Sequence, residues 1–359
     1  MRKDSFRMKR LLVALACVLA LTGCGVQGAY ESQDAQLREA LPDAQSAKDP
    51  RSFTGVSNVT DFEDVVAVTE SPTPALPVEL TDADGYDVSV TDVSRIVALD
   101  LYGTYTKTLE GLGLTDNIVG RTVSSTENAI ADRPVVTQGG HNINVEAVLE
   151  LRPTLFIVDH SIGPRDAIDQ IRAAGVTTVV MEPKRTIDSV DEDIKNLAAV
   201  VGLPDDGETL ANRSVEEIEK DKAAIADIVP EKPMRMAFLY ARGNGGIFFI
   251  MGEGTGAKDL IEGVGGVDLG TEYHLSYAEP ANAESLAKIN PEVIIMMTGG
   301  LESTGGVEGL LERPGIAQTT AGQKQRIVTI PDGQSLAFGP LTGQTLLKLA
   351  QAIYDPDNA

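Results

Sequence analysis

The sequence contains few of the residues on which many metal and redox sites depend. It has no Trp, three His and two Cys among its 359 residues. Both cysteines, Cys17 and Cys24, lie near the N-terminus, so the rest of the chain carries no thiol. These counts exclude a disulfide-rich scaffold, a cysteine-based zinc site and an iron–sulfur cluster.

Basic residues are also scarce. The chain has 30 Lys and Arg against 53 Asp and Glu, a formal net charge of −23. Nucleic-acid binding depends on the neutralisation of phosphates by Lys and Arg, and docking on anionic lipid needs a basic surface. We therefore expect no nucleic-acid partner and no basic membrane-binding face. The proportions of hydrophobic and charged residues, 42% and 23%, are those of a folded globular chain.

The N-terminal segment resembles the signal peptide of a bacterial lipoprotein. Basic residues precede an apolar run over 11–21, which is too short to span a membrane. The run ends in Leu21-Thr22-Gly23-Cys24, similar to a lipobox, in which the Cys receives a diacylglycerol and the preceding peptide is removed. An ordinary signal peptide with a chance Cys is the alternative. We expect a signal peptide over 1–23 and a lipid anchor at Cys24, on the extracytoplasmic face of the cell membrane.

Residues 24–92 differ in composition from the rest of the chain. Between 25 and 90 there are 13 acidic and 3 basic residues, with prolines at 72, 74 and 77. Such a segment repels itself and stays solvated, which predicts a flexible acidic tether. A small accessory subdomain is the alternative interpretation.

From residue 93 onward, short apolar strands alternate with helical segments. This alternation predicts two α/β lobes, over 93–204 and 231–359, each a mainly parallel sheet flanked by helices. An unbroken helical pattern predicts one long interlobe helix within 205–230. Asn144 is a suitable N-cap for a helix that starts at Val145.

Several unusual side chains follow predicted strands, where open α/β sheets bind ligands. His141 follows a strand over 135–137 and the pair Gly139-Gly140, and neutral imidazole is a good iron ligand. A solvent-exposed loop histidine fits the same spacing equally well. His160 also follows a strand, so position alone does not separate it from His141.

Tyr240 lies late in the first strand of the second lobe. Arg242 is two residues further on, so both side chains point to the same face of the strand. The phenolate is scarce at neutral pH, but ferric iron and a neighbouring cation both favour it. The pair therefore suits an oxygen ligand for Fe(III). A core tyrosine beside a surface arginine is the commoner arrangement when the pair is taken in isolation.

The order and spacing of several short segments over 93–355 resemble the class III substrate-binding proteins of ABC importers. This group carries haem, siderophores and cobalamin, and the chain is most similar to its corynebacterial haem-binding lipoproteins. The segments are Arg95-Ile96-Val97, Asn117-Ile118-Val119-Gly120, Glu150-Leu151-Arg152-Pro153-Thr154-Leu155, Gly265-Gly266-Val267 and Asn290-Pro291-Glu292-Val293-Ile294-Ile295.

The resemblance implies a ligand and its partners. Haem-binding members hold ferric haem with a His from the first lobe, a Tyr from the second, and an Arg beside that Tyr; His141, Tyr240 and Arg242 match these positions. Haem b is then the transported ligand, delivered to an ABC permease and its ATPase, with upstream haem-binding surface proteins as further partners. The family also places a surface acid on each lobe for permease arginines. Asp259 matches one, whereas Lys107 occupies the other position and Glu110 is the substitute.

Haem propionates are held by basic side chains, hydroxyls and helix N-termini. Residues of these kinds lie near the ends of predicted strands in both lobes. The candidates for the haem pocket are His160, Arg165, Thr255, Tyr273, Tyr277 and Thr298.

Three other functions compete with a haem receptor. A siderophore- or cobalamin-binding protein has the same fold. A zinc or manganese receptor needs several His and carboxylates together, which three scattered His fit poorly. An enzyme is disfavoured because the sequence has no nucleophile elbow, HExxH motif or P-loop. We therefore expect a binding protein and no enzyme.

Overall fold

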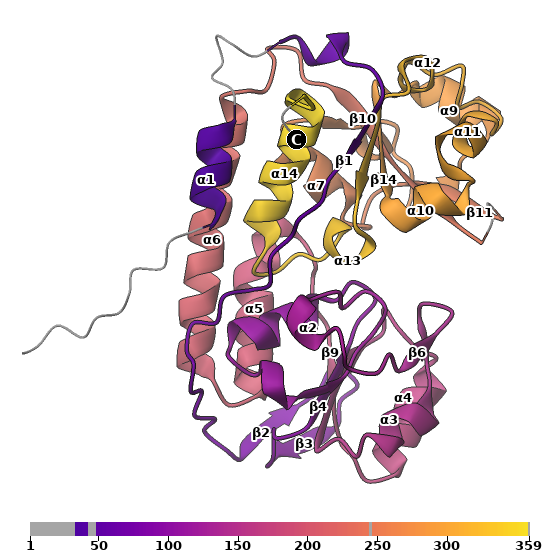
Figure 1. The fold of residues 1–359 in the computed structure, drawn as a ribbon. Coiled ribbons are helices and arrows are strands. Elements are labelled where there is room, and N and C mark those ends of the chain that lie inside the picture. Colours follow the sequence, from indigo (N-terminus) through magenta and orange to yellow (C-terminus); the bar gives the residue numbers. More distant parts are fainter. Residues whose placement is uncertain (1–32, 42–47, 244–245, 358–359) are drawn as a thin grey trace, which may run out of the picture. The chain divides into compact units, whose positions relative to one another are not determined.

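The computed structural model describes residues 33–41, 48–243 and 246–357 (Figure 1). The predicted signal peptide and Cys24 lie outside these ranges. The following description concerns Asp34–Ala359, which form one compact unit. None of the helices in the described ranges has the length and hydropathy of a membrane span.

The N-terminal lobe contains a parallel sheet of four strands in the order β5-β4-β8-β9. All residues of β4 and β8 are buried, as expected of parallel strands covered on both faces. The strands are β4 (Ile96–Leu99), β5 (Ile118–Gly120), β8 (Leu155–Asp159) and β9 (Thr177–Met181). The helices are α2 (Thr104–Gly111), α3 (Val145–Glu150), α4 (Arg165–Ala173) and α5 (Val190–Val200), with short 3₁₀ turns η2 (Thr115–Asn117), η3 (Asn128–Ile130) and η4 (Ile187–Ser189). The Asn144 side chain accepts a 3.2 Å hydrogen bond from the Ala147 N–H, so the predicted cap is confirmed.

The C-terminal lobe is built on a sheet in the order β1-β15-β14-β10-β11-β13, with β12 also paired to β10. Strands β1, β15, β14 and β10 are mutually parallel, whereas β11 and β13 are antiparallel to their neighbours. The strands are β1 (Val56–Asn58), β10 (Arg235–Arg242), β11 (Ile247–Met251), β12 (Val267–Asp268), β13 (Ala278–Pro280), β14 (Val293–Met297) and β15 (Ile327–Ile330). The helices are α7 (Ala257–Gly263), α8 (Leu269–Glu272), α9 (Ala283–Ile289), α10 (Thr298–Ser303), α11 (Gly306–Leu311), α12 (Thr320–Lys324), α13 (Asp332–Ser335) and α14 (Thr342–Tyr354).

The long helix α6 (Pro204–Ala226) joins the two lobes and confirms the predicted interlobe helix. Pro204 occupies the first turn, where its missing N–H has no partner to lose, and two acidic residues follow it at the positive end of the helix. With 23 residues it is about 35 Å long. It packs on α5 of the first lobe and on α14 of the second, as Figure 1 shows. The prediction of two α/β lobes with mainly parallel sheets is therefore confirmed.

The prediction of a flexible tether over 24–92 is wrong for residues 48–92, which we call the strap. Its first strand, β1, extends the sheet of the C-terminal lobe by pairing with β15. Further along, the Asp64 carboxylate accepts hydrogen bonds from the backbone of Asn128 and Ala129 in the N-terminal lobe, at 2.7 and 2.8 Å. The hairpin β2 (Val78–Thr81) and β3 (Asp87–Val90) then packs beside β9. Hydrogen bonds to residues distant in sequence thus order this acidic segment.

Two short helices complete the described N-terminal part. The turn η1 (Pro50–Ser52) begins the strap, and Arg51 forms an ion pair with Glu292 of the C-terminal lobe. The helix α1 (Gln33–Ala40) places Arg38 against Glu217 and Asp221 of α6. Asp34, Glu217 and Asp221 are the one group of potential metal-ligating side chains found in the described ranges, and Arg38 already pairs with two of them.

Candidate functional site

The carboxyl ends of the parallel strands in the two lobes come into contact. A β-carbon at Gly333, just after β15, would lie 2.2 Å from the backbone oxygen of Ser124, just after β5. The Ile187 N–H at the start of η4 donates a 3.3 Å hydrogen bond to Asp259 on α7. Since both loops at Gly333 and Ser124 follow parallel strands, the ligand-binding edges of the two sheets meet there.

His141 lies in the turn between the short strands β6 (Thr137–Gln138) and β7 (Asn142–Ile143). Gly139 and Gly140 precede it with φ angles of +59° and +89°, a backbone conformation that favours glycine. The His141 carbonyl accepts a 3.0 Å hydrogen bond from Gly163, which fixes the turn. The imidazole is exposed, and among the described residues no hydrogen bond or ion pair engages it. This side chain is therefore free to bind a ligand.

Tyr240 and Arg242 lie together near the carboxyl end of β10, as their spacing predicts. The Arg242 guanidinium carbon is 4.9 Å from the centre of the Tyr240 ring. Its Nη1 donates to the Ala241 carbonyl at 2.9 Å, and its Nη2 donates to the Met297 sulfur at 3.2 Å. Tyr240 is half-buried, and its phenol oxygen makes no hydrogen bond to the described residues. The pair thus places a positive charge beside a phenol whose oxygen has no hydrogen-bond partner in the described ranges.

Exposed apolar side chains flank these residues. Six large hydrophobic side chains are exposed in the described ranges, and three of them lie at the ends of the ligand-binding strands. Val123 follows β5, and Val135 pairs with Arg121 directly after that strand. Ile247 lies directly opposite Arg242 in the β10–β11 hairpin. A fourth, Tyr277, is 63% exposed beside β13. Ligand sites in proteins combine such apolar walls with a few convergent polar groups. Sequence reasoning missed the three aliphatic residues, because only the fold shows them to be exposed.

His160 and Arg165 are engaged with the strap. The His160 Nε2 and the Arg165 Nη2 each lie 2.9 Å from the same oxygen of Asp84, in the turn of the β2–β3 hairpin. The hydrogen bond to His160 lowers the pKa of the Asp84 carboxyl. Both side chains thus hold the hairpin to the N-terminal lobe, a role that explains their position without a ligand.

Two pocket candidates in the second lobe, Tyr273 and Thr255, have hydrogen-bond partners within that lobe. The Tyr273 oxygen accepts a 3.3 Å hydrogen bond from Arg235, at the opposite end of β10 from Tyr240. Tyr240 is five positions further along the strand than Arg235, about 17 Å away, so the Tyr273 hydroxyl is engaged at a distance from Tyr240. Thr255 is 6% exposed and donates its hydroxyl to the Gly252 carbonyl at 2.8 Å. Thr298 is half-buried at the start of α10, directly after β14.

The two predicted permease contacts differ in exposure. Glu110 is 4% exposed and accepts a 3.0 Å hydrogen bond from the Val65 N–H of the strap, so the prediction that it is a surface contact is wrong. Burial raises its pKa to about 7. Asp259 is half-buried, and burial also raises the pKa of its carboxyl. Its hydrogen bond to Ile187 uses one of its two oxygens.

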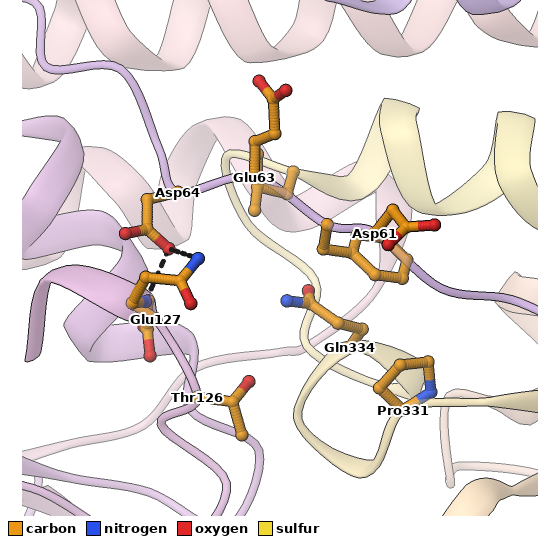
Figure 2. Close-up of a pocket in the computed structure, with 10 residues that line it drawn as sticks. Asp61, Glu63, Asp64, Thr126, Glu127, Pro331 and Gln334 are labelled. Carbon is orange, nitrogen blue, oxygen red and sulfur yellow. Dashed lines mark hydrogen bonds between the residues drawn. The ribbon is translucent and has the colours of Figure 1, made fainter. Parts of the chain in front are cut away.

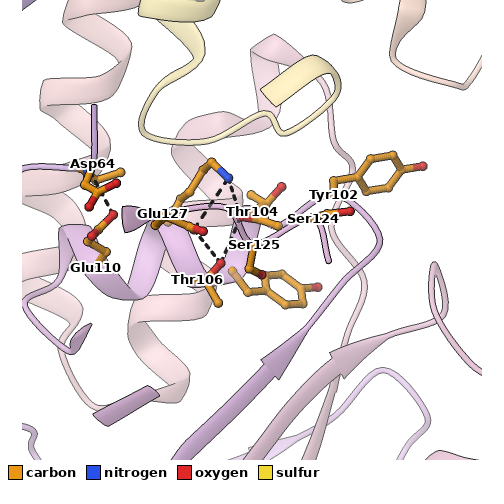
Figure 3. A network of polar contacts seen from close by, with 12 residues as sticks. Asp64, Tyr102, Thr104, Thr106, Glu110, Ser124, Ser125 and Glu127 are labelled. Atoms are coloured by element: carbon orange, nitrogen blue, oxygen red, sulfur yellow. Dashed lines mark hydrogen bonds and ion pairs between the residues drawn. The ribbon is translucent and has the colours of Figure 1, made fainter. Parts of the chain in front are cut away.

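Lys107, which occupies the other expected acidic position, is part of a buried network. It is fully buried, its Nζ lies 3.7 Å from a Glu127 oxygen, and Thr106 donates a 2.7 Å hydrogen bond to that same oxygen. Figure 3 shows Thr106 and Glu127 pointing toward each other, with Tyr102 turned away from them. The lysine thus stabilises the lobe from within and offers no surface charge.

A small pocket lies where the strap meets both lobes (Figure 2). Its volume is about 150 Å³, smaller than the usual range for sites of organic ligands. The residues that line it are Asp61, Phe62, Glu63, Asp64, Thr126, Glu127, Asn128, Pro331, Gln334 and Leu341. It does not include any of the predicted haem ligands.

Sequence reasoning also missed a charged cluster at the carboxyl edge of the first lobe. Arg185 forms an ion pair with Asp159, at the end of β8, and lies 3.7 Å from Asp100, which follows β4. Its guanidinium carbon is 4.9 Å from the centre of the Tyr102 ring, and burial raises the pKa of Tyr102 to about 12. The nearby phenol of Tyr277, from the other lobe, adds to that shift. An acid directly at the end of each strand was the signal available in the sequence.

Comparisons with known proteins agree with this architecture. The family model described as "Periplasmic binding protein" matches residues 96–333. A comparison with curated protein sequences finds no match. A crystal structure of heme binding protein HmuT is 62% identical, covers 86% of this chain and 100% of its own, and superimposes with a TM-score of 0.84. Other solved structures are described as the H141A mutant, the R242A mutant and Y240A of HmuT, at 59% to 62% identity.

A second relative is more distant. The periplasmic heme-binding protein RhuT from Roseiflexus sp. RS-1, in its apo form, is 32% identical, covers 74% of this chain and 99% of its own, and has a TM-score of 0.67. Both relatives share the two-lobed fold with this chain over almost their full lengths. The family model covers well over half of the residues, and the site residues lie at the strand ends inside that range. The chain therefore belongs to the periplasmic binding protein family.

Proposed function

We propose that this protein is a receptor for ferric haem, which it passes to an ABC import permease without converting it chemically. The observation that carries the proposal is the arrangement at the two strand edges: an exposed, unpaired imidazole in one lobe and an arginine-flanked phenol in the other. Relatives at 62% and 32% identity are described as heme-binding proteins, which supports haem as the ligand.

The chemistry of the three residues fits a low-spin or high-spin ferric centre held between the lobes. His141 supplies a neutral nitrogen, which binds iron readily. Tyr240 supplies an oxygen ligand for ferric iron, and the Arg242 guanidinium lies 4.9 Å from the centre of its ring. Solved structures of HmuT include the variants H141A, Y240A and R242A. This chain has the same residue types at the same three numbers, which supports the choice of these three residues as the haem site.

The remaining assignments complete the proposal. Tyr277 and Thr298 lie near the strand ends and serve as walls of the haem pocket, whereas His160, Arg165 and Thr255 have partners within the protein. Asp259 is the permease contact of the second lobe. Cys24 carries the lipid anchor that keeps the protein on the extracytoplasmic face of the membrane, where an ABC permease with its ATPase and upstream haem-binding surface proteins are its partners.

Titration of the purified protein with haemin tests the proposal. We expect a stoichiometric complex with a Soret band and a charge-transfer band from the phenolate, and no product when a reductant is added. Cyanocobalamin and a ferric siderophore, titrated in parallel, should leave tyrosine fluorescence unchanged. Saturable binding of either compound, with none of haemin, would favour the other ligand class of this fold.

A further inference from the structure

Arg242 has one carboxylate partner among the described residues, and this is Asp332. The Arg242 Nη2 forms an ion pair with Asp332 Oδ1, in addition to its contacts with the Ala241 carbonyl and the Met297 sulfur. The two side chains are 31% and 35% exposed. A planar guanidinium with several fixed acceptors holds a defined orientation, whereas an unanchored arginine samples many rotamers.

Asp332 is itself held in place by the backbone. It follows β15 and begins α13, and its second oxygen, Oδ2, accepts a 2.9 Å hydrogen bond from the Gly299 N–H. The two glycines after β14 leave room for the ion pair. A β-carbon at Gly299 would lie 3.1 Å from both oxygens of Asp332, and one at Gly300 would lie 3.2 Å from Arg242 Nη1. Each oxygen of the carboxylate therefore has its own partner.

We propose that Asp332 is the positioning residue for Arg242: it fixes the guanidinium beside the Tyr240 ring, from which the arginine acts on the phenolate. This inference rests on the proposed function, in which Tyr240 binds haem iron. Asp332 touches neither the ligand atom nor the iron in this account. Its effect on haem passes through Arg242, and it disappears when Arg242 is absent.

The same loop connects this ion pair to the opposite lobe. Gly333, the next residue, packs against the Ser124 backbone, and a β-carbon there would also lie 2.9 Å from the Thr126 hydroxyl. Figure 2 shows Pro331 and Gln334, on either side, facing the pocket between the strap and both lobes. A change in the separation of the lobes at this contact therefore displaces the residue that orients Arg242.

Haem transfer to apomyoglobin measures the effect. Asp332→Ala should raise the haem dissociation rate about threefold to tenfold, because a hydrogen bond to a charged group is lost. Its phenolate charge-transfer band should shift in the same direction as that of Arg242→Ala. Asp332→Asn keeps one acceptor oxygen and should give an intermediate rate. Glu272→Gln, which disrupts the exposed ion pair with Arg235 in the same lobe, is the matched control and should behave as wild type.

A double-mutant cycle and the apoprotein separate positioning from a general structural role. Arg242→Ala/Asp332→Ala should lose haem no faster than Arg242→Ala. In arginine side-chain NMR of the apoprotein, the Arg242 signal should be ordered in wild type and averaged in Asp332→Ala. Additive effects in the cycle, or an unchanged Arg242 signal, overturn the proposal even if the wild-type protein binds haem through Tyr240. If the wild-type protein shows no phenolate band, the proposed function fails, while the apoprotein NMR still tests the positioning.

Discussion

Both lobes contain an arginine stacked near a tyrosine and paired with an aspartate at the carboxyl edge of the sheet. In the first lobe Arg185 lies 4.9 Å from the Tyr102 ring and pairs with Asp159; in the second, Arg242 lies 4.9 Å from the Tyr240 ring and pairs with Asp332. The difference is burial. Arg185 and Asp159 are 16% and 3% exposed, whereas Arg242 and Asp332 are 31% and 35% exposed.

Burial decides what each cluster does. In the first lobe the Asp159 carboxylate also accepts a 2.5 Å hydrogen bond from the Tyr105 hydroxyl, and burial raises the pKa of Tyr105 well above its usual value. The two acceptors and the guanidinium of that cluster are therefore engaged mainly with one another, and the cluster stabilises the fold. In the second lobe the Tyr240 oxygen makes no hydrogen bond to the described residues. That cluster leaves a donor atom for a ligand.

The largest expected effect comes from opening the buried cluster. Asp159→Ala leaves Arg185 with only the more distant Asp100, so the free energy of unfolding should fall by about 3–5 kcal/mol. Asp332→Ala removes a half-buried, solvent-accessible ion pair and should lower it by only about 1 kcal/mol. Urea denaturation of the apoproteins measures both. Equal losses for the two variants would contradict the distinction by burial.

The next effect concerns the two tyrosines. Tyr240→Ala removes the proposed axial ligand, and we expect haem to dissociate about a hundredfold faster, with loss of the phenolate band. Tyr102→Phe keeps the ring above which Arg185 lies and should leave the band in place. Stopped-flow haem transfer and absorption spectra compare the two. A phenolate band that survives in Tyr240→Ala, or that disappears in Tyr102→Phe, would show that Tyr240 is not the tyrosine that binds the iron.

Glu110 extends the comparison to a buried acid without a basic partner on its oxygens. Its pKa is raised to about 7 in the folded protein, so the folded state binds a proton more tightly than the unfolded chain. Stability is then lost as the pH rises from about 4.5 through 7. Glu110→Gln keeps an acceptor for Val65 and should remove this loss. The variant should be more stable than wild type at pH 8 and similar to it at pH 4. If the two proteins differ in free energy of unfolding by the same amount at both pH values, the buried carboxyl does not cause the loss.

The smallest effect is expected at the contact between lobes. Gly333→Ala places a β-carbon where it would lie 2.2 Å from the Ser124 oxygen, so the contact must shift. Since Asp332 precedes it, the haem dissociation rate should rise by about twofold to fivefold. Gly175→Ala, at a position with open space around it but a φ of +91°, controls for the loss of a glycine. If Gly333→Ala releases haem at the wild-type rate, the contact between the lobes does not affect the orientation of Arg242.

Local sequence patterns predict the parts of the fold that depend on local interactions. Buried strands such as β8 are continuous apolar runs, and α6 begins at a proline followed by two acids. The Tyr240–Arg242 pair is equally local, because alternation along a strand puts residues two apart on one face. Local patterns cannot predict that the strap is ordered, because β1 pairs with β15, whose residues lie some 270 positions later in the chain.

Residues that act through distant contacts could not be predicted in the same way. Asp332 meets Arg242 only when β15 and β10 lie on either side of β14. Tyr273 offers a hydroxyl that suits a haem propionate, but in the fold that hydroxyl meets Arg235 at the opposite end of β10 from Tyr240. Glu110 resembles a surface acid in sequence, and only the strap buries it.

The central claim is that two donor atoms, one from each lobe, hold the same iron. A crystal structure of the haemin-loaded protein tests it most directly. We predict an iron bound by a ring nitrogen of His141 on one side and by the Tyr240 oxygen on the other, with Arg242 still paired to Asp332. Iron ligated by other residues, or haem bound outside the edge where Ser124 meets Gly333, would contradict the account.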